Sequence, residues 1–506
     1  MTERQLRWLR RPSLLAAATV LLVCMPTGEK DVTAAVHVTA ADLASLALVA
    51  VTGLALLRGR LPALDRTVAV LFGAVVVAAG VATVHSIDPA ASVTGFVRLV
   101  QVFVLVPAAV LCSLRDRLDQ QLVLGSLVVA ALVQGVVGAK QFLTGTGASY
   151  TGQPIRAIGT FGALDIMAMS TVVSFGLIAA LALALGERGP GGRRGLRIAC
   201  ACAAGFLLFP LAVSFSRGSW IATAVAVTVL LVRADVRLAL RGAVLALALG
   251  VVAIGGLGLG GDGVTERLTS IGSVSSAPDQ SVTDRYDLWG TAVRIWQDHP
   301  TTGAGPKAFQ QLRDSHAPLR LSSGSDAADS QIGFTREPLL SPHNMYFLVL
   351  SEQGLIGALA YLALLLTLLV NCLRNAGPDG RAPGGRRPGG GSTGSDPGAG
   401  AGAVAVAAGG SPVAGGAGAR STAGPAAGAA DAPSGRAPQP AAGVLPSVAR
   451  PAAGVPRGVR LAALGLLVWV VVDFLYADIG GTTTVLTSVI LGAALKAAFP
   501  GEAART

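Results

Sequence analysis

The feature that most limits how this chain can fold is a series of long apolar runs separated by short polar segments. A helix needs about 20 apolar residues to cross the hydrocarbon of a bilayer. Twelve runs approach this length, and they predict an all-α integral membrane protein with about twelve transmembrane helices. The runs occupy residues 14–25, 38–57, 67–84, 92–112, 122–142, 167–185, 196–215, 219–232, 238–259, 344–370, 459–475 and 482–498.

The composition excludes a set of soluble domains and argues against a nucleic-acid partner. Hydrophobic residues make up 52% of the chain and charged residues 13%, whereas soluble proteins carry roughly 25% charged residues. A formal net charge of +11 would suit nucleic acid if the basic residues formed one patch. They instead form short blocks between apolar runs. The expected surroundings are therefore a lipid bilayer.

Arginine blocks predict which way the spans face, because short loops rich in Lys and Arg stay cytoplasmic. If all twelve runs span, every block falls on one side, so both termini are predicted to be cytoplasmic and the protein to be multi-pass in the plasma membrane. The blocks contain Arg4, Arg7, Arg10, Arg11, Arg58, Arg60, Arg66, Arg115, Arg117, Arg188, Arg193, Arg194, Arg197, Arg233, Arg237 and Arg241. The histidines fall on the other side: His37, His85, His299, His316 and His343.

Two segments between spans stand apart from the rest. Residues 374–459 are rich in Gly, Pro and Ala without apolar periodicity, which predicts a disordered cytoplasmic insert. Residues 261–342 form a loop too long to lack structure or function of its own. The predicted domains are residues 1–260 with spans one to nine, 261–342 as an extracytoplasmic loop domain, 343–373 as span ten, 374–459 as the insert, and 460–506 with spans eleven and twelve and the tail.

Within the long loop, residues 284–297 are predicted to form an amphipathic helix. Its apolar stripe contains Leu288, Trp289, Ala292, Val293 and Trp296, at helical spacing. The two tryptophans suit an interfacial position, where the ring lies in lipid and the N–H meets water. The loop is therefore expected to pack on the outer membrane face, where any chemistry would occur.

His343 is the first candidate for chemistry. In Ser341-Pro342-His343-Asn344, the order predicts an N-cap serine, a proline at the first helical position and a histidine in the first turn. The positive end of the helix dipole disfavours imidazolium, so a neutral ring could act as a general base. A histidine that only caps the helix and bonds a loop is the alternative, and the residues leave both open.

Two arginines are candidates for holding an anion. Arg217 lies in the tight turn predicted between spans seven and eight, on the side where a positive charge opposes the orientation rule. Guanidinium binds phosphate through a rigid bidentate fork, although an arginine there could also reach the interface passively. Arg285 opens the amphipathic helix, where the dipole is unfavourable to it. A salt bridge with Asp287 or another neighbour is the alternative for Arg285.

A third segment offers weaker candidates for substrate binding. Arg156 precedes Gly159 and Gly162 in a predicted outer loop before the sixth span. Tyr150 and Phe161 could offer ring faces to a sugar or a prenyl chain. No pair of histidines has metal-ligand spacing, and there is no Walker motif or convincing dinucleotide fingerprint. We expect no metal and no cofactor. No ATP or nucleotide sugar is expected outside the membrane, so an enzyme there would need a pre-activated donor.

Taken together, these segments resemble the O-antigen ligase superfamily, which includes related O-antigen polymerases. The resemblance is good from residue 156 to 361 and rests elsewhere on the number of spans. The matching pieces are Arg156 to Gly162, Ser216-Arg217-Gly218, Arg285 to Trp296, His299-Pro300 with Gly303 and Gly305, Pro342-His343-Asn344-Met345-Tyr346, and Glu352-Gln353-Gly354-Leu355-Ile356-Gly357.

The resemblance implies a glycosyltransferase of polysaccharide biosynthesis in the cell envelope. Such enzymes move a glycan from an undecaprenyl diphosphate carrier to a hydroxyl of an acceptor glycan or envelope polymer, without metal and with inversion. By resemblance, Arg217 and Arg285 hold the diphosphate and His343 is the base. One alternative is a polysaccharide or lipid transporter or flippase, which would be expected to contain internal repeats and charged or broken spans. The other is a non-catalytic component of an envelope complex.

Overall fold

A computed structural model describes residues 11–26, 39–59, 61, 64–150, 155–162, 165, 167–186, 193–242, 280–321, 324–329, 333–377 and 455–500. Within these residues, eight helices or helix groups are long and apolar enough to cross a membrane. Each coincides with a predicted span, so the protein is a largely helical, multi-pass membrane protein. The eight are α3 (Ala40–Leu57), α4 (Arg66–Val84), α5–η1–α6 (Pro89–Ser113), α7 (Arg117–Thr144), α8 (Ala168–Gly186), α9 (Arg194–Ala212), α10 (Arg217–Ala234) and α15 (Met345–Asn375).

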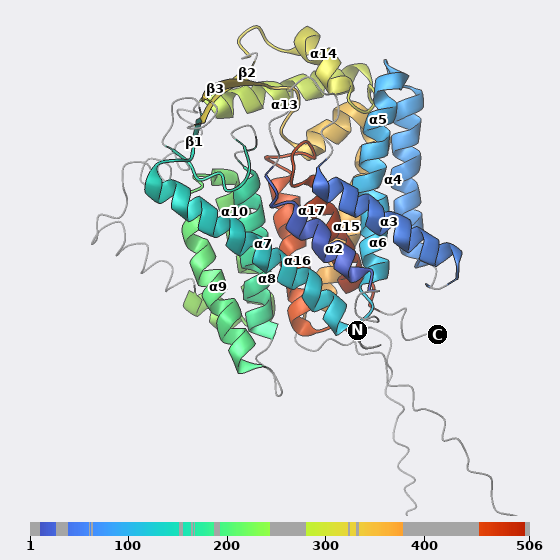
Figure 1. Cartoon of the computed structure of the whole chain (residues 1–506). Helices are drawn as coiled ribbons and strands as arrows, with labels where there is room; N and C mark the ends of the chain where they lie inside the picture. The colour runs from blue at the N-terminus through green and yellow to red at the C-terminus, as the bar shows by residue number, and fades with distance from the viewer. Residues whose placement is uncertain are drawn as a thin grey trace, which may run out of the picture. The chain divides into compact units, whose positions relative to one another are not determined.

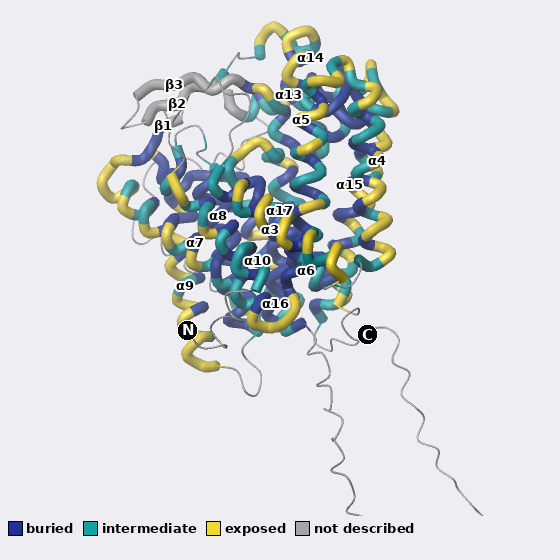
Figure 2. Tube along the Cα trace, turned by 45° about the vertical axis from the view of Figure 1, so that its right-hand side comes forward, coloured by how far each residue is buried: buried dark blue, intermediate teal, exposed yellow. Residues whose placement is uncertain are grey.

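The other four predicted spans have different outcomes. The first becomes a short helix, α2 (Ser13–Leu22), and the last two become α16 (Arg457–Asp473) and α17 (Thr484–Ala498). The predicted span 238–259 lies outside the described residues from 243 onward. Trp469 of α16 is 1% exposed, and its ring meets Phe175 of α8 edge-on at 4.7 Å between centroids. Figure 2 shows α8 and α16 largely buried, while α4 and α9 keep exposed outer faces. The shorter helix α16 is therefore enclosed by protein.

Polar side chains at the helix starts explain why the apolar runs break into these elements. An acceptor before the first turn satisfies backbone N–H groups that have no partner inside the helix. Thr39 with Asp42, and Asp116 with Asp119, form reciprocal capping boxes at α3 and α7. Single caps begin four further helices: Asp65 at α4, Asp88 at α5, Ser216 at α10 and Asn344 at α15.

The helix ends separate into two groups, which we call the basic end and the loop end. At the basic end, Arg11 pairs with Asp116 and Asp119, Arg233 donates to Leu373 O, and Arg457 donates to Ala234 O. The loop end carries α13 (Gln280–Asp298), α14 (Ala308–His316) and three strands (Figure 1). The described histidines, His85, His299, His316 and His343, follow or precede helices at the loop end. Assignment of the basic end to the cytoplasm stays a prediction.

The amphipathic helix predicted at 284–297 is present as α13, which begins four residues earlier. Leu288, Ala292 and Ile295 are buried on its inner face. Trp289 donates its ring N–H to Pro342 O at 3.0 Å, so the prediction that this N–H meets water is wrong. The ring N–H of Trp296 likewise donates to a backbone oxygen, that of Pro300, at 3.1 Å. Both tryptophans therefore fasten α13 to neighbouring backbone.

A small antiparallel sheet departs from the all-α prediction. It has the order β1 (Ala148–Tyr150), β2 (Gly324–Asp329), β3 (Gly333–Pro338), with Tyr150 opposite Ala327 and Ala327 opposite Thr335. The strands are short and rich in Gly, Ser and Asp, without the apolar alternation that marks a half-buried strand. For that reason the sequence did not predict them.

Helix α15 is not one continuous span as predicted. Gly354 interrupts it with φ 62° and ψ −161°, a conformation essentially confined to glycine. Residues 355–375 cover about 31 Å at 1.5 Å per residue, enough to cross the hydrocarbon alone. Residues 345–353 therefore form a separate short helix that begins beside His343.

Candidate active site

His343 lies before α15 and not in its first turn, so the predicted cap is corrected. Asn344 is the N-cap, and its side-chain oxygen accepts from Tyr346 N and Phe347 N at 3.0 and 3.1 Å. His343 has φ 47°, in the left-handed region that non-glycine residues rarely adopt and that concentrates at functional sites. Its N–H donates to Ser341 Oγ at 3.3 Å. The backbone thus holds His343 just before the capped N-terminus of the helix.

The turn between α16 and α17 encloses this helix start. Met345 N donates to Phe474 O at 2.9 Å and to Ala477 O at 3.1 Å. The amide of Asn344 donates to Leu475 O at 3.1 Å. Asp473 ends α16, and Asp478 lies in the turn that follows. The sequence reasoning missed both carboxylates, because they are separated from His343 by the long insert and carry no motif of their own.

Arg285 approaches His343 from α13. It lies in the second turn of that helix and not the first, because α13 begins at Gln280. One turn later, Trp289 bonds Pro342 O and lies 5.7 Å from the Phe347 ring, between centroids. Asp287, the partner considered for Arg285, accepts from Arg320 Nε at 2.8 Å, and its other oxygen also accepts from Arg320.

Burial and the neighbouring charges both shift the pKa of His343. Burial lowers the pKa of His343, the nearby Asp478 opposes that change, and the positive charge of Arg285 lowers the pKa further. Burial and the charge of Arg285 both favour the neutral imidazole. A neutral ring at pH 7 is the form that can accept a proton.

Arg217 is brought to the same turn from another side of the molecule. It is the first residue of α10, where Ser216 Oγ caps Ser219 N at 3.3 Å. Phe215 just before the cap has φ 49°. A Cβ on Gly218 would lie 3.5 Å from Tyr476 Cβ, so the start of α10 packs directly against the α16–α17 turn. The predicted tight turn between the two spans is present.

The weaker candidates around Arg156 lie in a well-packed region. The backbone of Arg156 forms an antiparallel bridge with Ala148, with N–O distances of 2.8 and 3.0 Å, and its side chain is buried. Phe161 is 4% exposed and belongs to the hydrophobic core. Tyr150 lies at the end of β1. The binding roles of these three residues stay predictions.

Asp165, in the segment just before α8, is hydrogen-bonded to the turn between α16 and α17. Its carboxylate accepts from Thr482 N at 3.0 Å and also from the Thr482 hydroxyl. Burial raises the pKa of Asp165, although both bonds from Thr482 oppose the change. This contact helps to hold the turn that carries Asp478, and the sequence contained no signal for it.

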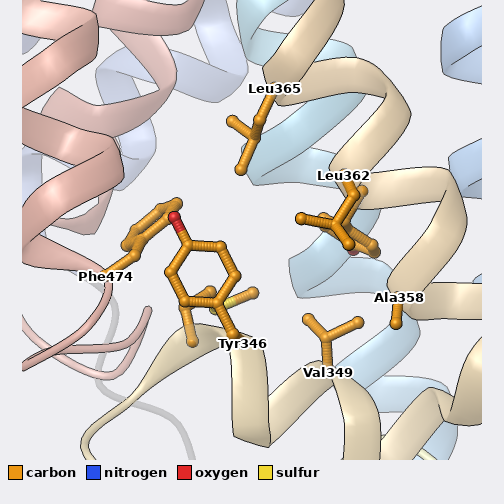
Figure 3. Close-up of a pocket in the computed structure, with 8 residues that line it drawn as sticks. Tyr346, Val349, Ala358, Leu362, Leu365 and Phe474 are labelled. Carbon is orange, nitrogen blue, oxygen red and sulfur yellow. The ribbon is translucent and has the colours of Figure 1, made fainter.

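An apolar cavity of about 50 Å³ lies in the angle of the broken helix α15. Figure 3 shows Tyr346 and Val349 of the first part facing Ala358, Leu362 and Leu365 of the second, with Phe474 closing one side. The lining of this cavity includes Met345, two residues after His343 in the chain. Among the described residues, no cluster of three or more His, Cys, Asp or Glu could hold a metal ion.

Residues 202–362 match the family model described as O-antigen ligase. This match confirms the resemblance to the O-antigen ligase superfamily. The O-antigen ligase segment runs from α9 to the second part of α15 and contains Arg217, Arg285 and His343, whereas Arg156 and Asp478 lie outside it. A comparison with curated proteins found no match.

Proposed function

We propose that the protein is a membrane glycan ligase or polymerase that transfers a glycan from a polyprenyl diphosphate carrier to an acceptor hydroxyl. The O-antigen ligase match supports ligase or polymerase activity in a membrane, with glycan and lipid-linked substrates. The observation that carries the finer proposal is the position of His343. A left-handed backbone holds it at the N-terminus of α15, within the electrostatic influence of Arg285 and Asp478.

In this reaction His343 is the general base. The acceptor oxygen attacks the anomeric carbon while its proton passes to the free ring nitrogen of His343. The bond between the anomeric carbon and the diphosphate oxygen breaks on the opposite face, so the configuration inverts and the carrier leaves as its diphosphate. No metal step is needed in this scheme, because guanidinium groups can stabilise the charge that develops on the leaving group.

Arg285 and Arg217 are the proposed diphosphate ligands. They come from different segments, α13 and the start of α10, and both segments pack against the groups around His343. Guanidinium is suited to two phosphates because its fork binds oxygens in pairs. The apolar cavity beside Met345 suits a substrate with a hydrocarbon part. Arg156, Tyr150 and Phe161 remain proposed substrate contacts.

The proposed site faces away from the cytoplasm in the cell membrane. The arginine-rich connections lie at the basic end and the candidate site at the loop end. The positive-inside rule therefore supports cytoplasmic termini and an extracytoplasmic site. There a lipid-linked diphosphate supplies the activation that a soluble nucleotide sugar supplies inside the cell.

The test is a transfer assay with the full chain in nanodiscs, a polyprenyl-diphosphate-linked oligosaccharide and a glycan acceptor. H343Q should reduce the rate by about 10²–10⁴, the usual contribution of a general base. H316Q is the matched control, because His316 also lies at the loop end but pairs with Asp298 at 2.9 Å. An unchanged rate in H343Q would contradict the proposal. Movement of the donor across a vesicle membrane without product would indicate a transporter.

A further inference from the structure

The break in α15 leaves backbone groups that a neighbouring segment satisfies. Residues 299–305, which directly follow α13, lie against Gly354 so closely that a Cβ there would be 2.4 Å from Thr301 O. Four backbone hydrogen bonds join the two segments. They are Leu355 N to Pro300 O (3.0 Å), Ile356 N to Thr301 O (3.2 Å), Ala304 N to Ser351 O (3.0 Å) and Gly305 N to Glu352 O (2.9 Å).

A buried carboxylate strengthens the same junction. Glu352 is 7% exposed, and its Oε1 accepts from Phe309 N at 3.3 Å in the first turn of α14. Helix α14 has no side-chain cap of its own, because Lys307 occupies the cap position with φ 66°. Glu352 therefore supplies the side-chain acceptor that α14 lacks.

The junction helps to hold α13 along the first part of α15. So does the bond from Trp289 Nε1 to Pro342 O, one residue before His343. Arg285 lies one turn before Trp289 on the same helix. The segment 299–309 is thus fixed to residues 351–356. Nearer the start of α13, the same helix brings Arg285 close to His343.

We propose that Glu352, together with the backbone junction at Gly354, is a positioning element that fixes Arg285 relative to His343. Glu352 does not touch the reacting atoms in this scheme. It acts through the 299–309 segment and α13. This inference rests on the proposed function, because the relation of Arg285 to His343 matters only if they act on one substrate.

The first experiment measures the junction without activity. Hydrogen exchange in nanodiscs should show protected amides at Ala304, Gly305, Leu355 and Ile356 in the wild-type protein. E352L should accelerate exchange across residues 299–309, whereas E352Q should not, because its amide oxygen can still accept from Phe309 N. Rapid exchange of these amides in the wild type would overturn the inference, even if E352L fails to fold.

The second experiment compares the pH–rate profiles of the two variants. The groups facing His343 are Arg285 from α13 and Asp478 from the α16–α17 turn, and Asp473 in turn interacts with Arg285 and Asp478. Because Arg285 lowers the pKa of His343, release of Arg285 in E352L should move the acid limb to higher pH. E352Q keeps an acceptor for Phe309 N, so its acid limb should stay at the wild-type pH.

We expect kcat of E352L to fall about 10²-fold, since a displacement of about 1 Å at an active site can cost that much. The acid limb of E352Q should lie at the same pH as in the wild type, and E352Q should keep at least a third of the wild-type rate. If E352L loses rate equally at every pH and the acid limb of its pH–rate profile stays at the wild-type pH, the positioning role is overturned. Failure of the proposed function would show differently, as a wild-type rate that H343Q leaves intact.

Discussion

The substitution Gly354→Ala tests the broken helix directly. At φ 62° and ψ −161°, a residue with a side chain is strained by about 1–3 kcal/mol. The new Cβ would lie 2.4 Å from Thr301 O and 2.6 Å from Gly303 N, and neither backbone atom can rotate away. The 299–305 segment must therefore retreat from α15.

Retreat breaks the bonds from Leu355 N and Ile356 N, each worth about 1 kcal/mol. With the backbone strain, the free energy of unfolding should fall by about 3–5 kcal/mol. The assay is reversible unfolding by SDS in mixed micelles, followed by tryptophan fluorescence.

Gly73→Ala is the matched control for that experiment. Gly73 lies inside α4, and a Cβ there would meet nothing within 4 Å. In a helix interior, alanine is favoured over glycine by up to about 1 kcal/mol, so this variant should be unchanged or slightly more stable. Equal stability of the two variants would refute the account of the break.

Three further predictions concern the site and the core. Asp478→Asn removes the charge that holds up the pKa of His343, so the acid limb of the pH–rate profile should move to lower pH; a limb at higher pH would contradict the arrangement. Arg98 pairs with the largely buried Asp42 at 2.6 Å, so Arg98→Leu should destabilise the protein by about 1–3 kcal/mol in SDS unfolding, and the double variant with Asp42→Asn, which keeps an acceptor for the capping box, should recover part of that loss. Phe161→Leu should cost about 1 kcal/mol of stability with KM for the lipid-linked donor unchanged, since the ring lies in the core; a raised KM would instead support the substrate contact predicted from the sequence.

The membrane-spanning elements were largely predictable because lipid imposes a minimum length on an apolar helix. Eight predicted spans have counterparts that are long enough. The short helix α16 shows the limit of this reasoning. Its Trp469 packs against Phe175 inside the protein, and protein contacts impose no such length.

The candidate site was predictable where a residue type is unusual for its place. His343 and Arg217 stand beside helix starts, and Arg285 lies in a helix with a clear apolar stripe. The carboxylates of Asp473 and Asp478 could not be found in this way, since only folding brings the α16–α17 turn to Asn344.

Local backbone geometry was the least predictable part of the site. Sequence order suggested that Ser341 caps the helix, but Asn344 offers an oxygen that reaches two N–H groups. That alternative leaves His343 outside the helix with a positive φ. Likewise, the break at Gly354 depends on the 299–305 segment, which supplies partners for the backbone groups that the break exposes.

The two residues flanking the long insert lie far from the chemistry. Gly377 adjoins Arg233, whose guanidinium nitrogen would be 3.1 Å from a Cβ at that glycine. Near the other end of the insert, Val455 lies two residues before Arg457, which bonds Ala234 O. Both positions belong to the basic end, so a fluorescent protein or an affinity tag spliced between them would give a handle for purification and imaging that leaves the opposite end of the helices untouched.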